Sequence, residues 1–268
     1  MPTIPLTDPL RIEYENLFNS CLLRPERISA IEGLINGLIA NKERYQTVSE
    51  IQGVPWSFIA VIHNMEASQN FTKHLHNGDP LSARTVQVPA GRPKKGNPPF
   101  TWEESACDAL AIKGLSAQND WSLAGTLYQL ERYNGFGYRL YHPHVLTPYL
   151  WSYSNLYTSG KYVSDGTWSD TAPSKQCGSA VLLRRMAESG AVEFPDQPAP
   201  KPEATPLVVA YSLSKSTDPS VVTRTQELQN WLNTFPGIFI KPDGVPGNRT
   251  SEAYKKVVGT YLLGDPRG

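Results

Sequence analysis

One carboxylate stands out in this sequence because of its surroundings. Glu66 is the only carboxylate in the largely apolar stretch 54–68. Ile59, Ile62 and His63 precede it at helical spacing, so all four side chains are expected to share one mostly apolar face. A carboxyl on such a face loses hydration, which raises its pKa and keeps it protonated, as a general acid for cleaving a glycosidic bond requires. The alternative is a glutamate at a helix end that faces solvent or pairs with a base.

Helical patterns dominate the residues that would position this carboxylate. Apolar periodicity, with the Thr101–Glu104 spacing of a capping box, predicts helices over residues 28–39, 54–68, 101–110, 123–133 and 176–189. The tract 74–99 differs, because turn residues surround the alternating segment 84–88, and it predicts a small β-hairpin or β-lobe. The expected fold class is α+β, mainly helical, with this β-lobe inserted between helices.

Prolines mark a boundary late in the chain. Residues 195–206 are rich in proline and are expected to form an extended, semi-rigid linker. Residues 1–194 would then be the main domain, and residues 207–268 a compact module. A chain of 268 residues is long enough for one sizeable domain and a small one.

The composition limits the class of partner. Lys and Arg together number 25, as do Asp and Glu, so the formal net charge is zero. Neither nucleic acid nor an anionic membrane is therefore an expected partner, and affinity must come from a shaped site. No apolar run approaches the length of a membrane span, and the first residues show no signal peptide. Release from the cytoplasm or by an unconventional route, a partner that lets the protein out, or a trimmed chain would each explain that.

The cysteines and histidines do not predict a cofactor or a metal site. Cys21, Cys107 and Cys177 lack metal-type spacing; the last two are expected to be buried thiols, and one disulfide stays open. His63 and Glu66 do not form the His-Glu-x-x-His pattern of metalloproteases. The two remaining histidines of this region, His74 and His76, flank a loop without a partner cluster. We therefore expect neither a metal nor another cofactor.

The C-terminal residues resemble the peptidoglycan-binding module of bacterial and phage wall enzymes. The resemblance is carried by Val222, Leu228-Gln229, Leu232-Asn233, Asp243-Gly244-Val245-Pro246-Gly247, Thr250 and Ala253. It covers most of residues 208–268 and implies a small three-helix module, with glycines in a tight interhelical turn that requires positive φ. The Phe-Gln ending of the family is replaced by Val257-Val-Gly-Thr-Tyr261.

The N-terminal domain resembles the lysozyme superfamily, and within it a bacterial lysozyme-like group. The shared residues are Ile62-His63, Glu66, Ser68, Phe71 and His74-Leu-His-Asn-Gly-Asp-Pro-Leu81. Glu66-Ala-Ser68 also resembles the Glu-Ser motif of lytic transglycosylases, which implies that Glu66 is the acid and base and that Ser68 supports the substrate or the acid. Tyr133-Asn134-Gly135 resembles the Tyr-Asn-x-Gly motif that lines their cleft. The Gly-Leu-Met-Gln segment of transglycosylases is absent.

A phage-type lysozyme pattern fits the tract after Glu66 better. In that family a glutamate is followed by an aspartate and, six residues later, by a threonine, which hold the attacking water on the β-lobe. Glu66, Asp79 and Thr85 are similar to this set, although the first gap is longer here. Asp79 lies in a polar Asn-Gly-Asp-Pro turn and should stay ionised, so two carboxyls would have contrasting environments. The same turn is also ordinary loop chemistry.

Other carboxylates and aromatic residues are weaker candidates. Glu103 is the reserve candidate for the base, whereas Glu104 has a structural role in the capping box. Asp108 and Glu131 are expected to be solvated helix charges. Aromatic side chains could stack on sugar rings, although about half of them are expected to pack the core; they are Tyr149, Trp151, Tyr153, Tyr157, Tyr162 and Trp168, of which Trp151 and Tyr157 are the chosen candidates.

These patterns lead to two hypotheses of different classes. The first is a muramidase, a glycoside hydrolase that cleaves β-1,4 linkages of peptidoglycan, with Glu66 as general acid and with Asp79 and Thr85 positioning water. Chitinase, chitosanase or lytic transglycosylase activity is the close enzymatic alternative. The second is a non-catalytic wall-binding protein of lysozyme fold, since fold does not guarantee chemistry. In either case we expect a monomer that acts at the cell wall, with a peptidoglycan-type polymer as its partner.

Overall fold

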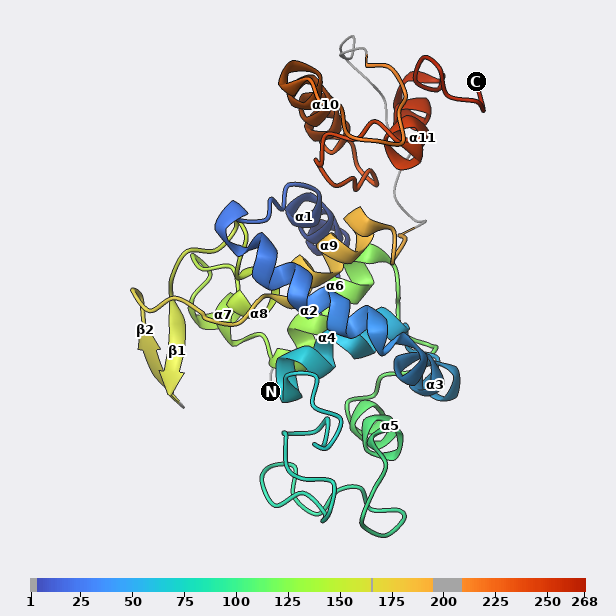
Figure 1. The fold of residues 1–268 in the computed structure, drawn as a ribbon. Coiled ribbons are helices and arrows are strands. Elements are labelled where there is room, and N and C mark those ends of the chain that lie inside the picture. The colour runs from blue at the N-terminus through green and yellow to red at the C-terminus, as the bar shows by residue number, and fades with distance from the viewer. Residues whose placement is uncertain (1–3, 165, 195–208) are drawn as a thin grey trace. The chain divides into compact units, whose positions relative to one another are not determined.

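The computed structural model describes residues 4–164, 166–194 and 209–268. The chain forms two compact units, Met1–Tyr14 with Cys21–Leu183, and Glu15–Ser20 with Arg184–Gly268 (Figure 1). The predicted linker 195–206 lies outside the described residues. Each unit is described by itself below.

The described part of the chain is mainly helical, with one small antiparallel sheet, which confirms the coarse fold class (Figure 1). The sheet pairs β1 (Lys161–Ser164) with β2 (Thr167–Ser169). The helices before it are α1 (Asp8–Asn19), the short 3₁₀ helix η1 (Pro25–Arg27), α2 (Ile28–Ala40), α3 (Lys42–Gln52), α4 (Trp56–Ala67), α5 (Trp102–Ile112), α6 (Leu123–Asn134), α7 (Gly137–Tyr141) and α8 (Pro148–Trp151); α9 (Ser179–Ser189) follows it. All five helices predicted from periodicity are present, as α2, α4, α5, α6 and α9.

Helix α4 is the central element of the first unit and carries Glu66 at its C-terminal end. It packs against α2, α3 and α6 (Figure 1), and most of its residues are buried. Its buried residues are Ser57, Phe58, Ile59, Ala60, Val61, Ile62, His63, Asn64 and Ala67. The helix ends at Ser68, which has φ +51° and whose N–H bonds to the Asn64 carbonyl. Trp56 at the start of α4 and Met65 and Glu66 near its end are only partly buried, so Glu66 lies at the edge of the core.

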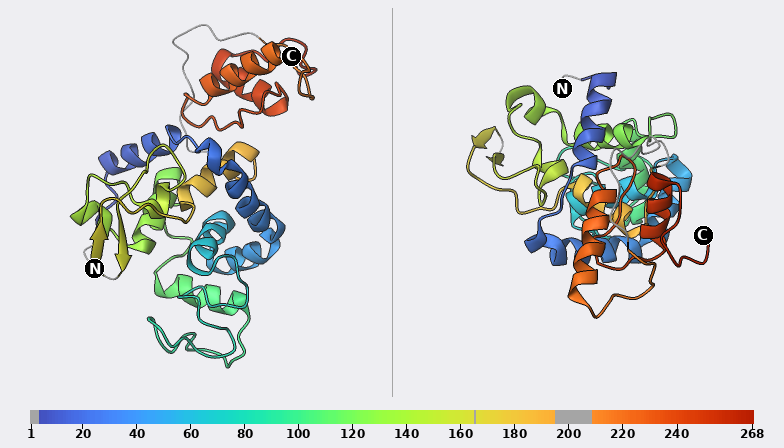
Figure 2. Two further views of the ribbon diagram at one scale, coloured as in Figure 1. Left: turned by 60° about the vertical axis from the view of Figure 1, so that its left-hand side comes forward. Right: turned by 90° about the horizontal axis from the view of Figure 1, so that it is seen from above.

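The tract 74–99 is an irregular loop rather than the predicted β-hairpin. It runs beside α5 without any β-strand, and Lys73–Pro80 is an isolated bridge (Figures 1 and 2). The Asp79 carboxylate accepts the backbone N–H groups of Val86 and Gln87, so these donors are not available to a neighbouring strand. The prolines that follow lack an N–H altogether. Alternation along 84–88 was therefore misleading, and the only described strands lie at 161–169.

The chain re-enters helix at α5 through the capping box that the sequence predicts. The Thr101 hydroxyl accepts the Glu104 N–H at 3.2 Å, and the Glu104 carboxylate accepts the Thr101 N–H at 2.8 Å. These bonds hold the pKa of Glu104 below its usual value. Glu104 is thereby a structural residue, as expected.

Residues 209–268 contain two helices, α10 (Pro219–Leu232) and α11 (Asn248–Val258), so the predicted three-helix module is wrong. The segments before α10 and after α11 are irregular and meet in an isolated parallel bridge between Ala210 and Leu263. Gly259 and Gly264, both at positive φ, prevent the last ten residues from continuing as helix. The core of this module consists of Val209, Leu228, Leu232, Ile238, Ile240, Ala253, Tyr254, Val257 and Leu262.

The residues that suggested a peptidoglycan-binding module fix the turn between α10 and α11. The Gln229 amide donates to the Asp243 carboxylate at 2.9 Å and to the Val245 carbonyl at 3.0 Å, and it accepts the Gly244 N–H at 2.9 Å. The same amide lies 3.1 Å from the Thr250 hydroxyl. Gly244 has φ +78°, the positive value expected for this turn. The shared motif therefore has a structural explanation in this chain.

Candidate active site

Glu66 is half-buried and makes one side-chain hydrogen bond. The Tyr149 hydroxyl donates to the Glu66 Oε1 atom at 3.0 Å. Burial raises the pKa of Glu66, while the Tyr149 hydrogen bond and the charge of Lys113 lower it to a smaller extent. The net shift is upward, the direction expected from the apolar helix. This carboxyl is therefore suited to donate a proton near neutral pH.

Two tyrosines border the Glu66 carboxyl, and both stay protonated. Tyr149 follows Thr147, whose hydroxyl caps α8, and its carbonyl accepts the Ser179 hydroxyl at 2.9 Å. Tyr133 lies in the last turn of α6 and is 8% exposed. Burial and the charge of Glu66 both raise the pKa of Tyr133 and of Tyr149. Both hydroxyls therefore keep their protons, that of Tyr149 donates to the carboxyl, and the predicted candidate Tyr133 belongs to this neighbourhood.

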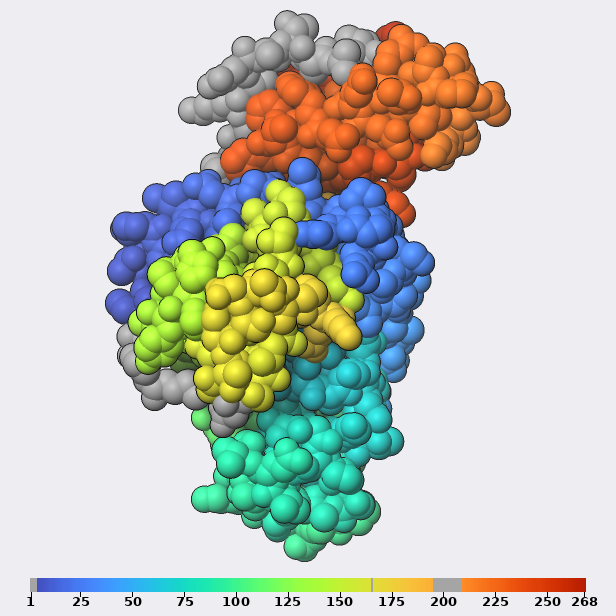
Figure 3. All heavy atoms as spheres, turned by 90° about the vertical axis from the view of Figure 1, so that its left-hand side faces the viewer, coloured from blue at the N-terminus to red at the C-terminus, as the bar shows by residue number. Residues whose placement is uncertain are grey.

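A pocket of about 160 Å³ is lined by Tyr149, whose hydroxyl bonds Glu66, and by Met65, the residue before Glu66, whereas Glu66 itself is not among its lining residues. Its walls come from the end of α4, the end of α6, α7, α8, β1 and the loop before α9, and consist of Met65, Asn134, Tyr138, Pro148, Tyr149, Lys161, Ser174 and Gln176. The Gln176 side chain donates to the Met65 carbonyl at 2.8 Å and so ties the loop to α4. Figure 3 shows the side of the first unit on which the yellow segment around β1 and β2 reaches the surface. The predicted Asn134 is exposed and lines this pocket.

Asp79 belongs to a loop that packs against the same end of α4. Gly78, at φ +79°, approaches the helix so closely that a Cβ there would lie 3.4 Å from the Glu66 carbonyl. The Asp79 Oδ2 atom accepts the N–H groups of Val86 (2.8 Å) and Gln87 (3.0 Å), and these bonds lower the pKa of Asp79. The carboxylate is therefore ionised, as expected. Its Oδ1 atom accepts no hydrogen bond from the described residues.

Thr85 is buried and its hydroxyl is used inside the loop. It donates to the Pro89 carbonyl at 2.5 Å and accepts the Arg92 N–H at 2.9 Å. The expected role of Thr85 in holding a water molecule is therefore not supported, because both its donor and its main acceptor direction are occupied.

Trp151 and Tyr157 are core residues rather than the predicted sugar-binding surfaces. Trp151 is 1% exposed and Tyr157 is 5% exposed, so neither ring can lie against a polymer. The Tyr157 hydroxyl donates to the Gly160 carbonyl at 3.2 Å and accepts the Ser174 N–H at 3.1 Å. Tyr157 thus acts indirectly, by holding Ser174 in the pocket wall.

Two further candidates lie at helix ends with different surroundings. Ser68 is exposed two residues after Glu66 and caps the end of α4 in the left-handed conformation, and its side chain makes no hydrogen bond within the described residues. Glu103 forms a two-point ion pair with Arg44 of α3, at 2.7 and 3.1 Å. The Arg44 guanidinium also lies over the Phe71 ring, 4.0 Å from its centre. Glu103 therefore links α5 to α3, and the reserve role as base has no support.

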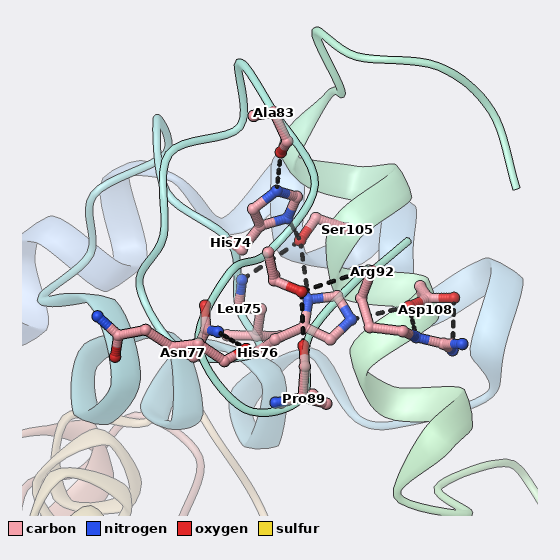
Figure 4. A network of polar contacts seen from close by, with 11 residues as sticks. His74, Leu75, His76, Asn77, Ala83, Pro89, Arg92, Ser105 and Asp108 are labelled. Atoms are coloured by element: carbon pink, nitrogen blue, oxygen red, sulfur yellow. Dashed lines mark hydrogen bonds and ion pairs between the residues drawn. The ribbon is translucent and has the colours of Figure 1, made fainter. Parts of the chain in front are cut away.

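A second cluster contains serine, histidine and aspartate, the residue types of a nucleophilic triad (Figure 4). The Ser105 hydroxyl lies 2.8 Å from His74 Nδ1 and 3.4 Å from His76 Nδ1. His76 Nε2 lies 2.8 Å from Asp108, and His74 Nε2 lies 2.8 Å from the Ala83 carbonyl. Ser105 and His74 have no exposed surface at all. We name this cluster the loop network, because it fastens the tract 74–99 to α5 out of reach of any substrate.

Two carboxylates expected to be solvated are instead paired, Asp108 at a partly buried position and Glu131 in the interior. Asp108 forms a two-point ion pair with Arg92, both bonds at 2.8 Å, in addition to its contact with His76 (Figure 4). Glu131 is 2% exposed; it accepts the Tyr14 hydroxyl at 2.5 Å and pairs with Arg139 at 2.9 Å. Their partners lie 8 to 117 residues away in sequence, beyond the spacing of neighbouring helical turns, so no local pattern revealed them.

Three residues of the Glu66 neighbourhood were not singled out by sequence reasoning. Tyr149 belongs to the aromatic segment considered above, but the sequence did not distinguish it from the aromatic residues of that segment that are buried. Lys113 and Lys161 carried no motif at all. Their positions depend on how separate elements meet at the end of α4.

Comparison of the chain with models of protein families, with curated proteins and with solved structures finds no match. Among the described residues, no three His, Cys, Asp or Glu side chains are grouped so as to hold a metal ion. Cys21, Cys107 and Cys177 are free thiols, and burial raises the pKa of Cys107 and of Cys177. None of the described helices has the length and apolar character needed to cross a lipid bilayer.

Proposed function

We propose that the protein is a glycoside hydrolase that cleaves β-1,4 linkages of peptidoglycan, with Glu66 as the general acid. The observation that carries the proposal is a carboxyl of raised pKa that accepts a hydrogen bond from Tyr149, a residue that lines a pocket. A glycosidic oxygen is a poor leaving group until it is protonated, and a carboxyl kept neutral by burial supplies that proton. The lysozyme-like character of the domain and the action at the cell wall are parts of this proposal.

The surroundings of Glu66 also suit the second half of proton transfer. Once the proton has left, the Tyr149 hydroxyl and the charge of Lys113 stabilise the new carboxylate. Asp79 is the second carboxylate of the proposal: its Oδ2 is held by backbone amides, and its Oδ1 remains for a water molecule. Attack by that water from the opposite face would invert the sugar.

A lytic transglycosylase is the second candidate, favoured by a different observation. The pocket contains no carboxylate among its lining residues, so Glu66 would act alone there. In that case the 6-hydroxyl of the muramic residue itself attacks, Glu66 serves first as acid and then as base, and the product ends in an anhydro sugar. The two candidates make opposite statements about Asp79: the hydrolase requires its carboxylate and the transglycosylase does not.

Clearing of purified peptidoglycan tests both candidates, with mass spectrometry of the released sugars. Glu66→Gln should lower the rate by about 10²–10⁴-fold, because the amide cannot donate the proton. Glu50→Gln is the matched control, since Glu50 is exposed on α3 and should be as active as wild type. Reducing ends and loss of activity in Asp79→Asn would support the hydrolase, whereas anhydro ends and an active Asp79→Asn would support the transglycosylase. Unchanged lysis by Glu66→Gln would refute the assignment of the acid.

If wild type does not clear peptidoglycan, the same assay on chitin and chitosan examines the related polymers. Inactivity on all three would leave the wall-binding alternative, in which residues 209–268 hold the protein on peptidoglycan without cleavage. A pull-down with insoluble peptidoglycan would then show binding by Glu66→Gln and wild type alike.

The stability of Glu66→Gln checks that any loss of activity is chemical. A carboxyl whose pKa is raised on folding favours the folded state at low pH, and this contribution is lost as the pH rises through its folded pKa. Glu66→Gln removes the ionisation, so its thermal midpoint should exceed that of wild type at pH 8 and approach it at pH 4. A midpoint lower than wild type at both pH values would show damage to the fold instead.

A further inference from the structure

The pocket beside Glu66 has a one-sided charge. Of its eight lining residues only Lys161 is charged, and none is a carboxylate. The nearest acid, Glu66, carries no charge in the protonated form that a general acid needs, and Lys113 adds a second positive charge close to it. In its active protonation state the site is therefore cationic, which favours anionic ligand groups and disfavours protonated amines.

Two donors in the pocket wall have no partner among the residues that the structure describes. The Gln176 amide donates to the Met65 carbonyl, the Ser174 hydroxyl lies 3.3 Å from the Gln176 carbonyl, and Tyr149 donates to Glu66. By contrast, neither the Lys161 ammonium nor the Asn134 amide makes a hydrogen bond or ion pair with the described residues. A ligand that accepts hydrogen bonds would complete them.

The backbone of Lys161 is firmly placed. It pairs with Ser169 across the two-stranded sheet. The next residue, Tyr162, packs edge-on against Trp168, whose ring is stacked on His142 at a centroid distance of 3.5 Å. Tyr138, which lines the pocket, also packs edge-on against Trp168, at 5.5 Å. The aromatic cluster thus joins the sheet to the pocket wall, so the Lys161 stem starts from a fixed point.

We propose that this pocket binds a carboxylate carried by the substrate, with Lys161 as the residue that determines specificity and Asn134 as its neutral partner. The inference rests on the proposed function and narrows it. In peptidoglycan the muramic residue bears a lactyl ether whose carboxyl is either free or extended by the stem peptide, which carries carboxylates of its own. Chitin has no such group and chitosan is a polycation, so Lys161 would select peptidoglycan among β-1,4 amino-sugar polymers.

Calorimetric binding to the full-length Glu66→Gln chain tests this without turnover. The three ligands are a peptide-free muramic-acid tetrasaccharide, its peptide-bearing form, and the neutral chitotetraose. Adding Lys161→Met should weaken binding of the carboxylate ligands about tenfold and leave chitotetraose unchanged, since a hydrogen-bonded charge pair contributes about one decade in affinity. Lys161→Arg keeps the charge and should retain most of the affinity. Loss confined to the peptide-bearing form would place the carboxylate in the stem peptide.

Lys175→Met is the control for a change of net charge near the pocket. Lys175 is exposed between two lining residues but does not itself line the pocket, so its substitution should leave all three affinities unchanged. Residues 209–268 are the same in every variant, so any glycan binding by that module cancels. The inference is overturned if Lys161→Met weakens chitotetraose as much as the acidic ligands, if it weakens neither, or if wild-type Lys161 gives no binding of the acidic ligands.

The two proposals fail in distinguishable ways. If peptidoglycan cleavage depends on Glu66 but is unchanged by Lys161→Met, the carboxylate-binding role of the pocket is refuted and the hydrolase proposal stands. A Lys161-dependent preference for acidic glycans in a protein that cleaves nothing would refute the hydrolase and keep the binding pocket.

Discussion

Two polar regions of the first unit contain side chains that enzymes use, and they differ in what is left unsatisfied. In the loop network, Ser105, His74 and His76 bond to one another, to a carbonyl or to Asp108, within the interior (Figure 4). At Glu66, the Tyr149 hydroxyl bonds the carboxyl, and the pocket that Tyr149 lines contains two donors without a partner among the described residues. Residue types alone would have favoured the first region. Access and unfilled hydrogen-bonding capacity favour the second.

The difference has a physical basis in burial. A polar group in the core must find its partners within the protein, because an unsatisfied one costs about 1–3 kcal/mol. The loop network meets this condition and stabilises an otherwise irregular loop. Glu66 remains poorly solvated, so the fold holds a carboxyl in a state that costs stability at high pH. Such a cost is expected where a group is kept for chemistry rather than for folding.

The largest effect that separates the two regions should come from Asp108→Asn. The substitution weakens the ion pair with Arg92 and the contact with His76, both mostly buried, and should lower the free energy of unfolding by about 2–3 kcal/mol. Urea titration would measure it, with the exposed Glu50→Gln as control. Peptidoglycan cleavage per folded molecule should stay within about threefold of wild type at a temperature where both are folded. If activity disappears while the fold survives, the loop network takes part in the chemistry and the contrast is wrong.

Tyr149→Phe should give the next effect, on the Glu66 side of the comparison. Loss of the hydroxyl removes a hydrogen bond to the carboxylate and should lower the cleavage rate about tenfold. It also removes an interaction that lowers the pKa of Glu66, so this pKa rises further. Because the acid must be protonated, activity is lost as the pH rises through that pKa, and the alkaline limb of the pH profile should move to higher pH. The control is Tyr153→Phe, because the Tyr153 hydroxyl donates to the Lys175 carbonyl and not to Glu66. It should leave the alkaline limb of the pH profile unchanged.

If Tyr149→Phe lowers the cleavage rate without moving the alkaline limb of the pH profile, the Tyr149 hydroxyl only orients the Glu66 carboxyl. A displacement to lower pH would contradict the assignment of that limb to Glu66.

The part of the fold that the sequence predicted is the part set by local periodicity. Helix α4 and the capping box of α5 depend on residues within a few positions of one another, and both were correct. The β-hairpin failed because the Asp79 side chain, seven and eight residues before the amides in question, takes the donors that a strand would use. Alternation along a segment carries no information about such a competitor.

The candidate site, too, could be predicted from the sequence only where its residues depend on local patterns. The raised pKa of Glu66 follows from an apolar helical pattern that is local in the sequence, and Tyr133 and Asn134, which belong to a short motif, lie in its neighbourhood. Trp151 and Tyr157 were misjudged, since an aromatic tract does not reveal which rings face inward. Lys161 had no signal, because it reaches the pocket through the pairing of β1 with β2.

Lys113→Met should give the smallest effect of the three substitutions. It tests how much a nearby charge, rather than a hydrogen bond, contributes to the pKa of Glu66. Lys113 is exposed, its ammonium lies 3.2 Å from the Tyr133 carbonyl, and its charge lowers the pKa of Glu66 less than the Tyr149 hydrogen bond does. Removing the charge should therefore move the alkaline limb to higher pH by less than Tyr149→Phe, with little change in maximal rate. The pH profile of cleavage measures both quantities.

Salt distinguishes this charge from the hydrogen bond. At 1 M ionic strength the Debye length falls to about 3 Å, so the exposed Lys113 is screened whereas the Tyr149 hydrogen bond is not. Salt should then shift the alkaline limb of wild type upward, shift that of Tyr149→Phe similarly, and leave that of Lys113→Met almost unmoved. An equal salt shift in Lys113→Met would mean that another cation acts on Glu66, and Lys161 would be the first to substitute, because it is the charged residue that lines the adjoining pocket.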